Sequence, residues 1–417
     1  MRRFYRSLYE EHVEELAFLY AQRCAALTDP AWALSDLFGL EARLEANLDA
    51  LVLGGEWARQ VCQEQLGSDD VGALYGAVRV LARHQAYKAI GLVVAALDCD
   101  DGPRLAALGE ALLAEAVGPQ WAAPMDQWLQ QLHDPRLQAT LARVAGLRGL
   151  PVGESIHRVA QSAPEGQVGE AIVALGRLGF RPAEMLFYRY LQGATPANAQ
   201  RAALAALRLG NTATRAKLVQ YAGQGSWAAL PLALAGHLLE AKRLGLWAAD
   251  DPSVILALGL HGGREACEVL VQLLTVTASA EQAAAALDLV TGAGGLVEVP
   301  VEASALSGSE DDDGGLAVRW QQQTAPEYWR QQLGELERRG HWANERPVTA
   351  QVILQALQNT RLPLEWRESL ADGLALRFAE GFGYAPYFSV IEQQRACARF
   401  HAWIHKGGGD ARHGRRQ

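Results

Sequence analysis

The sequence is poor in cysteine and contains no paired cysteine motif. Five of the 417 residues are cysteines, and no two of them are separated by only two residues. An odd number of dispersed thiols does not form a disulfide framework, and the absence of Cys-x-x-Cys excludes the usual redox and zinc motifs. We therefore expect reduced thiols, mostly in the core of a cytoplasmic protein. They are Cys24, Cys62, Cys99, Cys267 and Cys397.

The sequence also lacks a long apolar run and an excess of positive charge. No uncharged stretch reaches about 18 apolar residues, the length needed for a membrane-spanning helix. The basic start, Met1 to Arg6, is followed by Glu10 and Glu11 and not by an apolar segment, so we expect no signal peptide. The net charge of −9 and the pI of about 5.6 argue against a broad nucleic-acid-binding surface, although a local basic groove is compatible with them.

Motifs of several enzyme classes are absent as well. There is no Gly-x-Ser-x-Gly nucleophile motif and no Gly-x-x-x-x-Gly-Lys-Ser/Thr phosphate loop. Around His12 the order is His-Val-Glu-Glu, which lacks the second histidine that a His-Glu-x-x-His zinc site requires. The sequence thus predicts a protein that is not an enzyme, with no catalytic residue and no cofactor.

Two further groups contain residue types that can bind metal ions, but neither group has the full pattern of a metal site. His401 and His405 are four residues apart and fit one helix face, but no third ligand is evident nearby. The acidic run Asp311 to Asp313 lacks the alternating order and the terminal glutamate of a calcium loop. We interpret the histidines as solvated and the acidic run as part of a linker, and we predict no metal site.

What the sequence does contain is a repeat of about 30 residues between Asp134 and Ala222. Helical runs end at Gly149, Gly179 and Gly210, at intervals of 30 and 31 residues, and a shorter second run follows each glycine. Alanine and leucine dominate the composition and β-branched runs are scarce, which favours helices. This period predicts an all-α fold, an α-solenoid of stacked helical hairpins.

Each copy has the pattern of a helix with one buried face. Apolar or small residues stand at 168, 171, 172, 175 and 178, the spacing of an amphipathic helix. We expect Gly179 to end this helix in the left-handed conformation, which glycine adopts without steric cost. Pro182 then opens the second helix. Less regular copies end near Gly236, Gly262 and Gly292, and an earlier copy at Ala77 to His84 has no glycine.

The third copy resembles a known repeat. Gln-Arg-Ala-Ala-Leu-Ala-Ala-Leu-Arg-Leu-Gly-Asn, residues 200–211, is similar to the short HEAT repeat that is also found in phycobilisome-lyase-type proteins. The small residues of this segment, Ala202, Ala203, Ala205 and Ala206, fit close packing between neighbouring helices. The resemblance implies HEAT-like hairpins.

The N-terminal part resembles an uncharacterised bacterial family of HEAT-repeat proteins. That family has a Glu-Glu-x-x-Phe-Leu segment and an Arg-x-x-Ala-x-Leu-Asp-x-Leu segment before its repeats. The matching residues are Glu14, Glu15, Phe18, Leu19, Arg23, Arg43, Ala46, Leu48, Asp49 and Leu51. Asn47 stands where the family is expected to have a histidine. The resemblance implies an association with type VI secretion clusters.

The pattern divides the chain into five parts. After Gly292 the period fails, a strand-like alternation follows at Val297 to Val301, and Ser307 to Gly315 reads as an acidic, flexible loop. The predicted parts are an N-terminal helical cap (1–70), a HEAT-like repeat region (71–295), an irregular acidic and Trp-rich insertion (296–346), a C-terminal helical cap (347–405) and a disordered basic tail (406–417).

The second helices of the hairpins are the predicted binding surface. Because second helices commonly line the concave face of a solenoid, their outward residues are candidates for contact with a partner protein. These residues are Glu154, Arg158, Gln161, Glu184, Tyr188, Gln192, Lys217 and Gln220. The simpler alternative is that they are solvated surface residues. A second candidate is an aromatic group of Trp320, Trp329 and Trp342, which either anchors the insertion or forms an exposed patch.

Together these observations favour a non-enzymatic scaffold that binds another protein, such as an adaptor, a chaperone or an immunity-type factor of a bacterial secretion system. Two enzymatic alternatives remain. A bilin-lyase-like enzyme shares this repeat type but needs a chromophore pocket and a reactive thiol. A DNA-repair glycosylase on a HEAT-like scaffold needs a basic groove. The sequence indicates neither the partner nor the oligomeric state.

Overall fold

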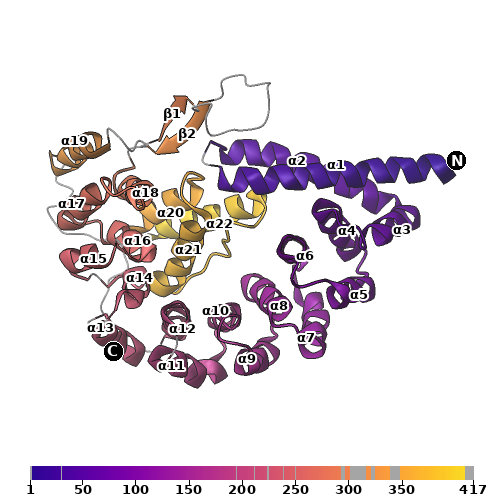
Figure 1. Cartoon of the computed structure of the whole chain (residues 1–417), viewed down its shortest axis with the longest axis horizontal. Helices are drawn as coiled ribbons and strands as arrows, with labels where there is room; N and C mark the ends of the chain where they lie inside the picture. The colour runs from indigo at the N-terminus through magenta and orange to yellow at the C-terminus, as the bar shows by residue number, and fades with distance from the viewer. Residues whose placement is uncertain are drawn as a thin grey trace. The chain divides into compact units, whose positions relative to one another are not determined.

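The computed structural model shows a chain built almost entirely of helices (Figure 1). It describes residues 2–29, 31–193, 195–210, 212–222, 225–237, 239–248, 250–292, 296–300, 316–320, 325–338 and 348–408. The one pair of strands in these ranges, β1 (Leu296–Pro300) and β2 (Leu316–Trp320), forms an antiparallel ribbon in which Val297 is opposite Arg319. The predicted all-α class is therefore confirmed, with one small ribbon where a strand-like alternation was expected.

The chain divides into two compact units. Unit 1 contains Met1–Ala26, Leu34–Thr214 and Tyr387–Gln393, and unit 2 contains Leu27–Ala33, Arg215–Pro386 and Gln394–Gln417. The boundary after Thr214 falls inside the predicted repeat region, 71–295. Unit 1 includes a segment, Tyr387–Gln393, that lies far along the sequence from the rest of the unit.

The helices that lie wholly or mainly in unit 1 form hairpins in sequence order. They are α1 (Arg2–Thr28), α2 (Leu34–Leu53), α3 (Gly55–Gln65), α4 (Val71–Arg83), α5 (Tyr87–Ala96), α6 (Gly102–Glu115), η1 (Pro119–Trp121), α7 (Ala122–Gln131), α8 (Pro135–Arg148), α9 (Gly153–Ser162), α10 (Gly169–Arg177), η2 (Arg181–Ala183), α11 (Glu184–Gly193) and α12 (Pro196–Arg208).

Unit 2 continues the series. Its helices are the larger part of α13 (Thr212–Tyr221), then η3 (Ser226–Ala228), α14 (Ala229–Leu234), α15 (Ala241–Trp247), α16 (Pro252–His261), α17 (Arg264–Leu273), α18 (Ala280–Thr291), α19 (Ala325–Arg338), α20 (Ala350–Gln358), α21 (Leu364–Phe378), most of α22 (Val390–Trp403) and a final π-helical turn, η6 (Ile404–Gly408).

The hairpins of unit 1 are arranged in two rows (Figure 1). The first helices of the hairpins, α4, α6, α8, α10 and α12, follow one another along the inner side of the unit's curve and pack against each other. The second helices, α5, α7, α9 and α11, lie along the outer side. We call these the inner row and the outer row. Leu108, Leu141 and Ile172 on the inner row are fully buried, so the core lies between the rows.

Small residues let the inner-row helices approach closely. A Cβ atom built on Gly146 of α8 would lie 2.7 Å from Cα of Ala174 on α10, and one built on Gly176 would lie 2.6 Å from Cα of Ala205 on α12. These two contacts are one repeat apart in sequence. Any larger side chain at the two glycines would push the helices apart. In both repeats a glycine facing an alanine therefore allows the same close distance between neighbouring helices.

The helix-ending glycines occupy equivalent positions. Gly149, Gly179 and Gly210 all have positive φ angles, 66°, 62° and 77°, as the sequence period predicted. The three less regular copies behave in the same way, because Gly236, Gly262 and Gly292 also have positive φ. In the copy that lacks a glycine, Gln85 takes this conformation instead, with φ of 55°.

Several predicted parts differ in detail from the structure. The segment 296–346 was expected to be irregular, but its described residues form the β1–β2 ribbon and the 14-residue helix α19. The expected C-terminal helices are present as α20, α21 and α22. The acidic loop Ser307 to Gly315 and most of the basic tail lie outside the described residues. Within the described residues, no helix has the length and apolar character of a membrane span.

Candidate functional site

The segment Tyr387–Gln393 lies among helices of unit 1 and carries its own helix start. Ser389 and Glu392 form a capping box at the beginning of α22: the Ser389 N–H donates to the Glu392 carboxylate at 3.3 Å, and the Glu392 N–H donates to Ser389 Oγ at 3.4 Å. This pair satisfies two backbone N–H groups at the start of the helix, those of Ser389 and Glu392. Phe388 and Val390 of the segment are buried.

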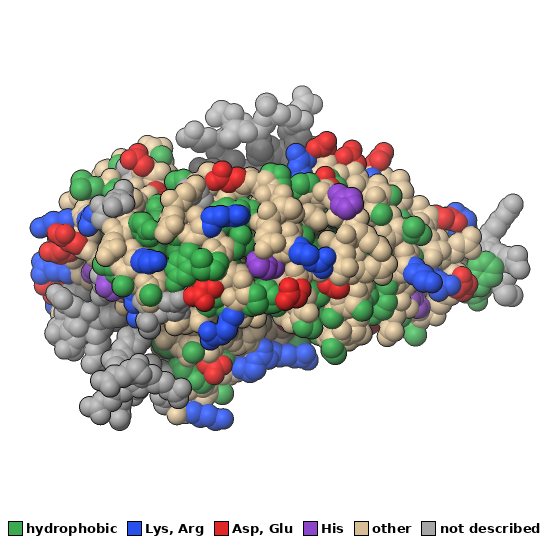
Figure 2. Space-filling model, turned by 90° about the horizontal axis from the view of Figure 1, so that it is seen from below, with side chains coloured by type: hydrophobic (Ala, Val, Ile, Leu, Met, Phe, Trp, Pro, Cys, Tyr) green, Lys and Arg blue, Asp and Glu red, His purple; other side chains and the backbone are tan. Residues whose placement is uncertain are grey.

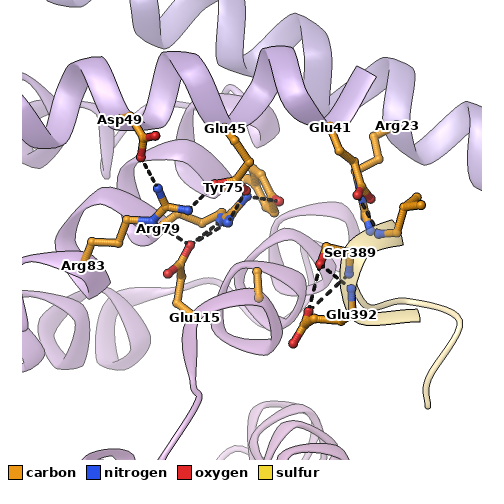
Figure 3. Close-up of polar contacts among 12 residues, drawn as sticks. Arg23, Glu41, Glu45, Asp49, Tyr75, Arg79, Arg83, Glu115, Ser389 and Glu392 are labelled. Atoms are coloured by element: carbon orange, nitrogen blue, oxygen red, sulfur yellow. Dashed lines mark hydrogen bonds and ion pairs between the residues drawn. The ribbon is translucent and has the colours of Figure 1, made fainter. Parts of the chain in front are cut away.

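A buried ion pair on α1 and α2 holds the main chain of this segment (Figure 3). Arg23 Nε donates to Glu41 Oε1 at 2.9 Å, and both side chains are nearly inaccessible to solvent. Arg23 Nη2 also donates to the carbonyl of Tyr387 at 3.1 Å, and the N–H of Val390 donates to Glu41 Oε2 at 2.7 Å. The ion pair therefore forms hydrogen bonds with one backbone acceptor, the Tyr387 carbonyl, and one backbone donor, the Val390 N–H.

Two arginines of α8 hold the side chains of the segment. The Arg148 guanidinium lies 4.0 Å from the ring centre of Phe388 and donates to Glu392 at 2.6 Å. The Arg143 guanidinium lies 4.4 Å from the ring centre of Tyr387. Each aromatic ring of the segment is thus stacked on one arginine of the inner row, an arrangement in which the cation is attracted by the face of the ring.

A second charged cluster joins α2, α4 and α6 beside this ion pair (Figure 3). Buried Arg79 donates to Glu45 at 2.8 Å and to Tyr75 Oη at 3.0 Å, and it pairs with Glu115 at 2.6 Å. Arg83 bonds to the same two glutamates. Burial alone disfavours the charge on Arg79, but Tyr75, Glu115 and Glu45 outweigh it and raise the pKa of Arg79.

The two arginines of this cluster act on Glu45 in return. Burial alone would raise the pKa of Glu45, but the charges and hydrogen bonds of Arg79 and Arg83 are stronger and lower it. All ions of the cluster are paired, so it has the character of a structural network that fixes the N-terminal helices against the inner row. We assign it no chemistry of its own.

A pocket of about 400 Å³ opens on the inner row next to the segment. Its walls come from α6, α8, the start of α10 and Tyr387. The lining residues are Gly102, Leu105, Ala106, Gly109, Glu110, Leu113, Arg136, Ala139, Thr140, Arg143, Val144, Leu147, Gln167, Glu170 and Tyr387. Most of them are only partly buried, so the pocket is accessible from solvent.

The pocket is lined by matching faces of two neighbouring helices, and some of the residues on these faces are small. The lining residues of α6 stand at 102, 105, 106, 109, 110 and 113, and those of α8 at 136, 139, 140, 143, 144 and 147, the same helical stripe twice. Glycine or alanine occupies four of these twelve positions. A Cβ on Gly109 would lie 2.8 Å from Cγ2 of Thr140, so the glycine lets the two helices lie near each other.

None of the five cysteines, all of which are described, lines this pocket. Cys24 lies close to the lining residue Glu110, with its Sγ 3.9 Å from Glu110 Oε2. Burial and the neighbouring Glu110 raise the pKa of Cys24. Burial also raises the pKa of Cys62 and Cys267 to about 12 and of Cys99 and Cys397 to about 11. The thiolate form, which is the nucleophile, is therefore disfavoured at every cysteine.

The residues predicted to line the concave face lie elsewhere. Glu154, Arg158 and Gln161 are on α9, Glu184, Tyr188 and Gln192 are on α11, and Lys217 and Gln220 are on α13. Their side chains are exposed or half-buried, as expected of outward positions. However, α9 and α11 form the outer row of unit 1, and Lys217 and Gln220 belong to unit 2. The expectation that second helices face the inside of the curve is wrong for unit 1, whereas partner binding by these residues stays a prediction.

The surface on the outer-row side carries mixed charge. Figure 2 views this side and shows Lys and Arg interspersed with Asp and Glu, with hydrophobic side chains between them. Arg158 donates to Ser155 at 2.7 Å, and Tyr188 Oη lies 3.2 Å from Thr214 Oγ1. On the face drawn, the described residues form no extended basic area of the kind that nucleic-acid binding requires.

The remaining candidates are partly described. Trp329 on α19 is fully buried, as an anchor would be, while only the backbone of Trp320 in β2 is described and Trp342 lies outside the described residues. The imidazoles of His401 and His405 lie 2.9 Å apart on an exposed helix end. Among the described residues no group of three or more His, Cys, Asp or Glu side chains is placed to hold a metal ion. Asp311 to Asp313 lie outside that part of the chain.

Sequence reasoning missed both features of this site. The lining residues of α6 and α8 share one helical spacing in the sequence, but the sequence does not indicate that the two helix faces meet at a pocket. The segment Tyr387–Gln393 gave one local signal, the Ser-x-x-Glu capping box, and no signal of where it docks. No protein-family model, no curated protein and no solved structure matches the chain.

Proposed function

We propose that the chain is a non-enzymatic scaffold that binds a partner protein on the inner row of unit 1. The observation that carries the proposal is that this face already holds a polypeptide segment, Tyr387–Gln393, from a distant part of the sequence. Arg148 of the inner row bonds to a carboxylate of the segment, and beside it Arg23 of α1 and Glu41 of α2 bond to the segment's main chain.

The pocket next to this segment supports the same role. The inner row stacks two arginines on the aromatic side chains of the segment and has accessible space beside them, so it has the polar and aromatic character of a protein-binding surface. The short HEAT repeat, which residues 200–211 resemble, fits such a scaffold. The resemblance of the N-terminal part makes components of a bacterial secretion system the first partners to test, in an adaptor, chaperone or immunity-type role.

The pocket also favours one rival, a bilin-lyase-like enzyme, because about 400 Å³ is within the range of small-molecule sites. Such an enzyme handles a thiol, yet no cysteine of the chain lines the pocket. The raised pKa values of the thiols also oppose their use as nucleophiles. The glycosylase alternative has less support, because charges of both signs are mixed on the face shown in Figure 2.

The test is a binding titration with two matched groups of variants. The native partner is first identified by affinity purification of the full chain and mass spectrometry. Inner-row variants Thr140→Arg and Leu147→Glu are then compared with outer-row variants Arg158→Glu and Tyr188→Ala, with circular dichroism as the folding control. We expect the inner-row changes to weaken binding by about 1–3 kcal/mol each. Loss of binding only in the outer-row variants would move the interface to α9 and α11, and unchanged binding in all four would reject both faces.

A further inference from the structure

The accessible pocket is continuous with the contact that unit 1 makes with the segment Tyr387–Gln393. Tyr387 is both the first residue of that segment and part of the pocket wall, and Arg143 both stacks on Tyr387 and lines the pocket. A chain that extended the segment's contact surface along the inner row would therefore enter the space between α6 and α8. This continuity indicates a polypeptide as the occupant.

Two arginines of the inner row stack on aromatic rings in the same way. Arg148 stacks on Phe388 and Arg143 stacks on Tyr387, with guanidinium-to-ring distances of 4.0 Å and 4.4 Å. Arg143 and Arg148 stand on the same helix, and the two rings are neighbours in sequence. An aromatic side chain in the pocket would lie next to the stacked pair of Arg143 and Tyr387 and would add a third ring to this row of arginine–ring contacts.

The chemistry of the pocket suits an aromatic side chain better than a charged one. Its walls are made mainly by Leu105, Leu113, Val144 and Leu147 with the small residues between them. Its titratable side chains carry both signs: Glu110 and Glu170 are acidic, and Arg136 and Arg143 are basic. Arg136 is already bonded to Asp100 and to the carbonyl of Cys99. No single charge is selected, so shape and ring stacking decide what binds.

We propose that the pocket between α6 and α8 receives an aromatic side chain from a linear segment of a partner protein, packed against Arg143 and Tyr387. This inference rests on the proposed scaffold function and names the kind of partner segment that it binds. The backbone of that segment runs along the inner row beside Tyr387, and the aromatic residue is its anchor.

The test uses the full-length chain and a defined probe, a blocked pentapeptide of glycines with a central fluorotryptophan, followed by fluorine NMR. A pentapeptide with a central trifluoroleucine is the comparison for a side chain that is apolar but not aromatic, and free fluoroindole is the comparison for a small molecule. Each probe is titrated with the protein, and the broadening of its fluorine signal is measured. We expect saturable, weak binding of the fluorotryptophan peptide and clearly weaker binding of the leucine analogue.

Two pairs of variants locate the binding. Ala106→Leu fills the pocket from α6, and Ala89→Leu is its control, because Ala89 lines a different apolar groove with Leu92 and Leu66. Arg143→Met keeps side-chain length and removes the cation, and Arg189→Met makes the same change at an arginine of α11 that stacks on Tyr190 and does not line the pocket. We expect Ala106→Leu to abolish binding of the aromatic peptide and Arg143→Met to weaken it about 2- to 5-fold. Neither control should change it.

Three results would overturn the inference. One is the absence of saturable binding, or equal binding of the leucine and tryptophan peptides. Another is binding that persists in folded Ala106→Leu. The third is binding of free fluoroindole without binding of the peptide, which would make the pocket a small-molecule site. If the peptide fails while the native partner still binds and depends on Thr140 and Leu147, the scaffold function stands and only the aromatic anchor is rejected.

Discussion

The carboxylate of Glu41 accepts a hydrogen bond of 2.7 Å from the backbone N–H of Val390, a residue 349 positions further along the chain. Val390 is the first residue of α22, so the negative charge lies at a helix N-terminus, where unpaired N–H groups favour an anion. The other oxygen of Glu41 is bonded to Arg23, which holds the carbonyl of Tyr387. One buried ion pair thus fixes both ends of the short turn that begins the helix.

Replacing Glu41 should destabilise unit 1 strongly. Glu41→Ala leaves Arg23 as a buried charge whose closest remaining carboxylate is Glu110, at 4.0 Å. We expect a loss of about 3 kcal/mol, measured from the midpoint of urea unfolding. Glu41→Gln keeps an acceptor for the Val390 N–H and should lose less.

The control for this prediction is an ion pair of the same residue types at the surface. Glu15 and Arg43 lie 2.9 Å apart, with side chains about half exposed. Glu15→Ala should cost no more than about 1 kcal/mol. Equal effects of Glu41→Ala and Glu15→Ala would contradict the idea that the buried pair holds the segment.

A second prediction concerns the helix-ending glycines. Gly179 has φ of 62° and no atom within 4 Å of a built Cβ, so the cost of Gly179→Ala comes from backbone strain alone, about 1 kcal/mol. Gly166→Ala, at an exposed position without positive φ and equally open space, should be neutral within about 0.5 kcal/mol. Gly176→Ala should cost more than either, because its Cβ would lie 2.6 Å from Cα of Ala205. Thermal unfolding of the three variants tests this order.

The repeat could be predicted from sequence because its signals are local. The left-handed conformation at Gly179 and Gly210 follows from the end of an apolar period followed by a glycine, and both are confirmed. The same rule fails to mark Gln85, which takes the conformation without being a glycine. There the position in the hairpin overrides the residue preference, which a single sequence does not reveal.

The candidate site could not be predicted from local sequence patterns, for two physical reasons. Periodicity shows which face of α9 is buried in its hairpin, but the direction in which the stacked hairpins curve depends on small differences in packing between rows. Gly146 against Ala174 is one of those contacts, and it brings the inner row together. The docking of Tyr387 on Arg143 joins residues far apart in sequence, and no local pattern encodes it.

A third prediction concerns the thiols. Because burial raises the pKa of all five cysteines, alkylation of the folded chain at about pH 8 should be much slower than alkylation of a free thiol. Cys62, Cys267 and Cys397 are buried and should react last, whereas Cys24 and Cys99 are half-buried. Mass spectrometry of iodoacetamide-treated protein measures the order, and a urea-unfolded sample in which all five react is the control. One thiol reacting as fast as free cysteine would revive the lyase alternative.

The last prediction is a pH dependence that comes from Glu45. Arg79 and Arg83 lower its pKa in the folded chain below the usual 4.5, which describes the unfolded state. A carboxyl group with a depressed folded pKa stabilises the fold fully above its unfolded pKa, and this contribution is lost as the pH falls through the folded pKa. The urea concentration at the midpoint of unfolding should therefore decrease as the pH is lowered from about 5 to about 3, and this decrease should be smaller in Glu45→Gln.

The size of this effect is limited by solvent, because the Glu45 side chain is 41% exposed. Added salt should accordingly reduce the difference between the parent and Glu45→Gln, since screening weakens partly exposed ion pairs. Glu11→Gln, which removes an exposed carboxylate of α1, is the matched control and should follow the parent curve. If the parent and Glu45→Gln keep the same pH profile at low salt, the ion pairs of Arg79 and Arg83 do not carry the pH dependence.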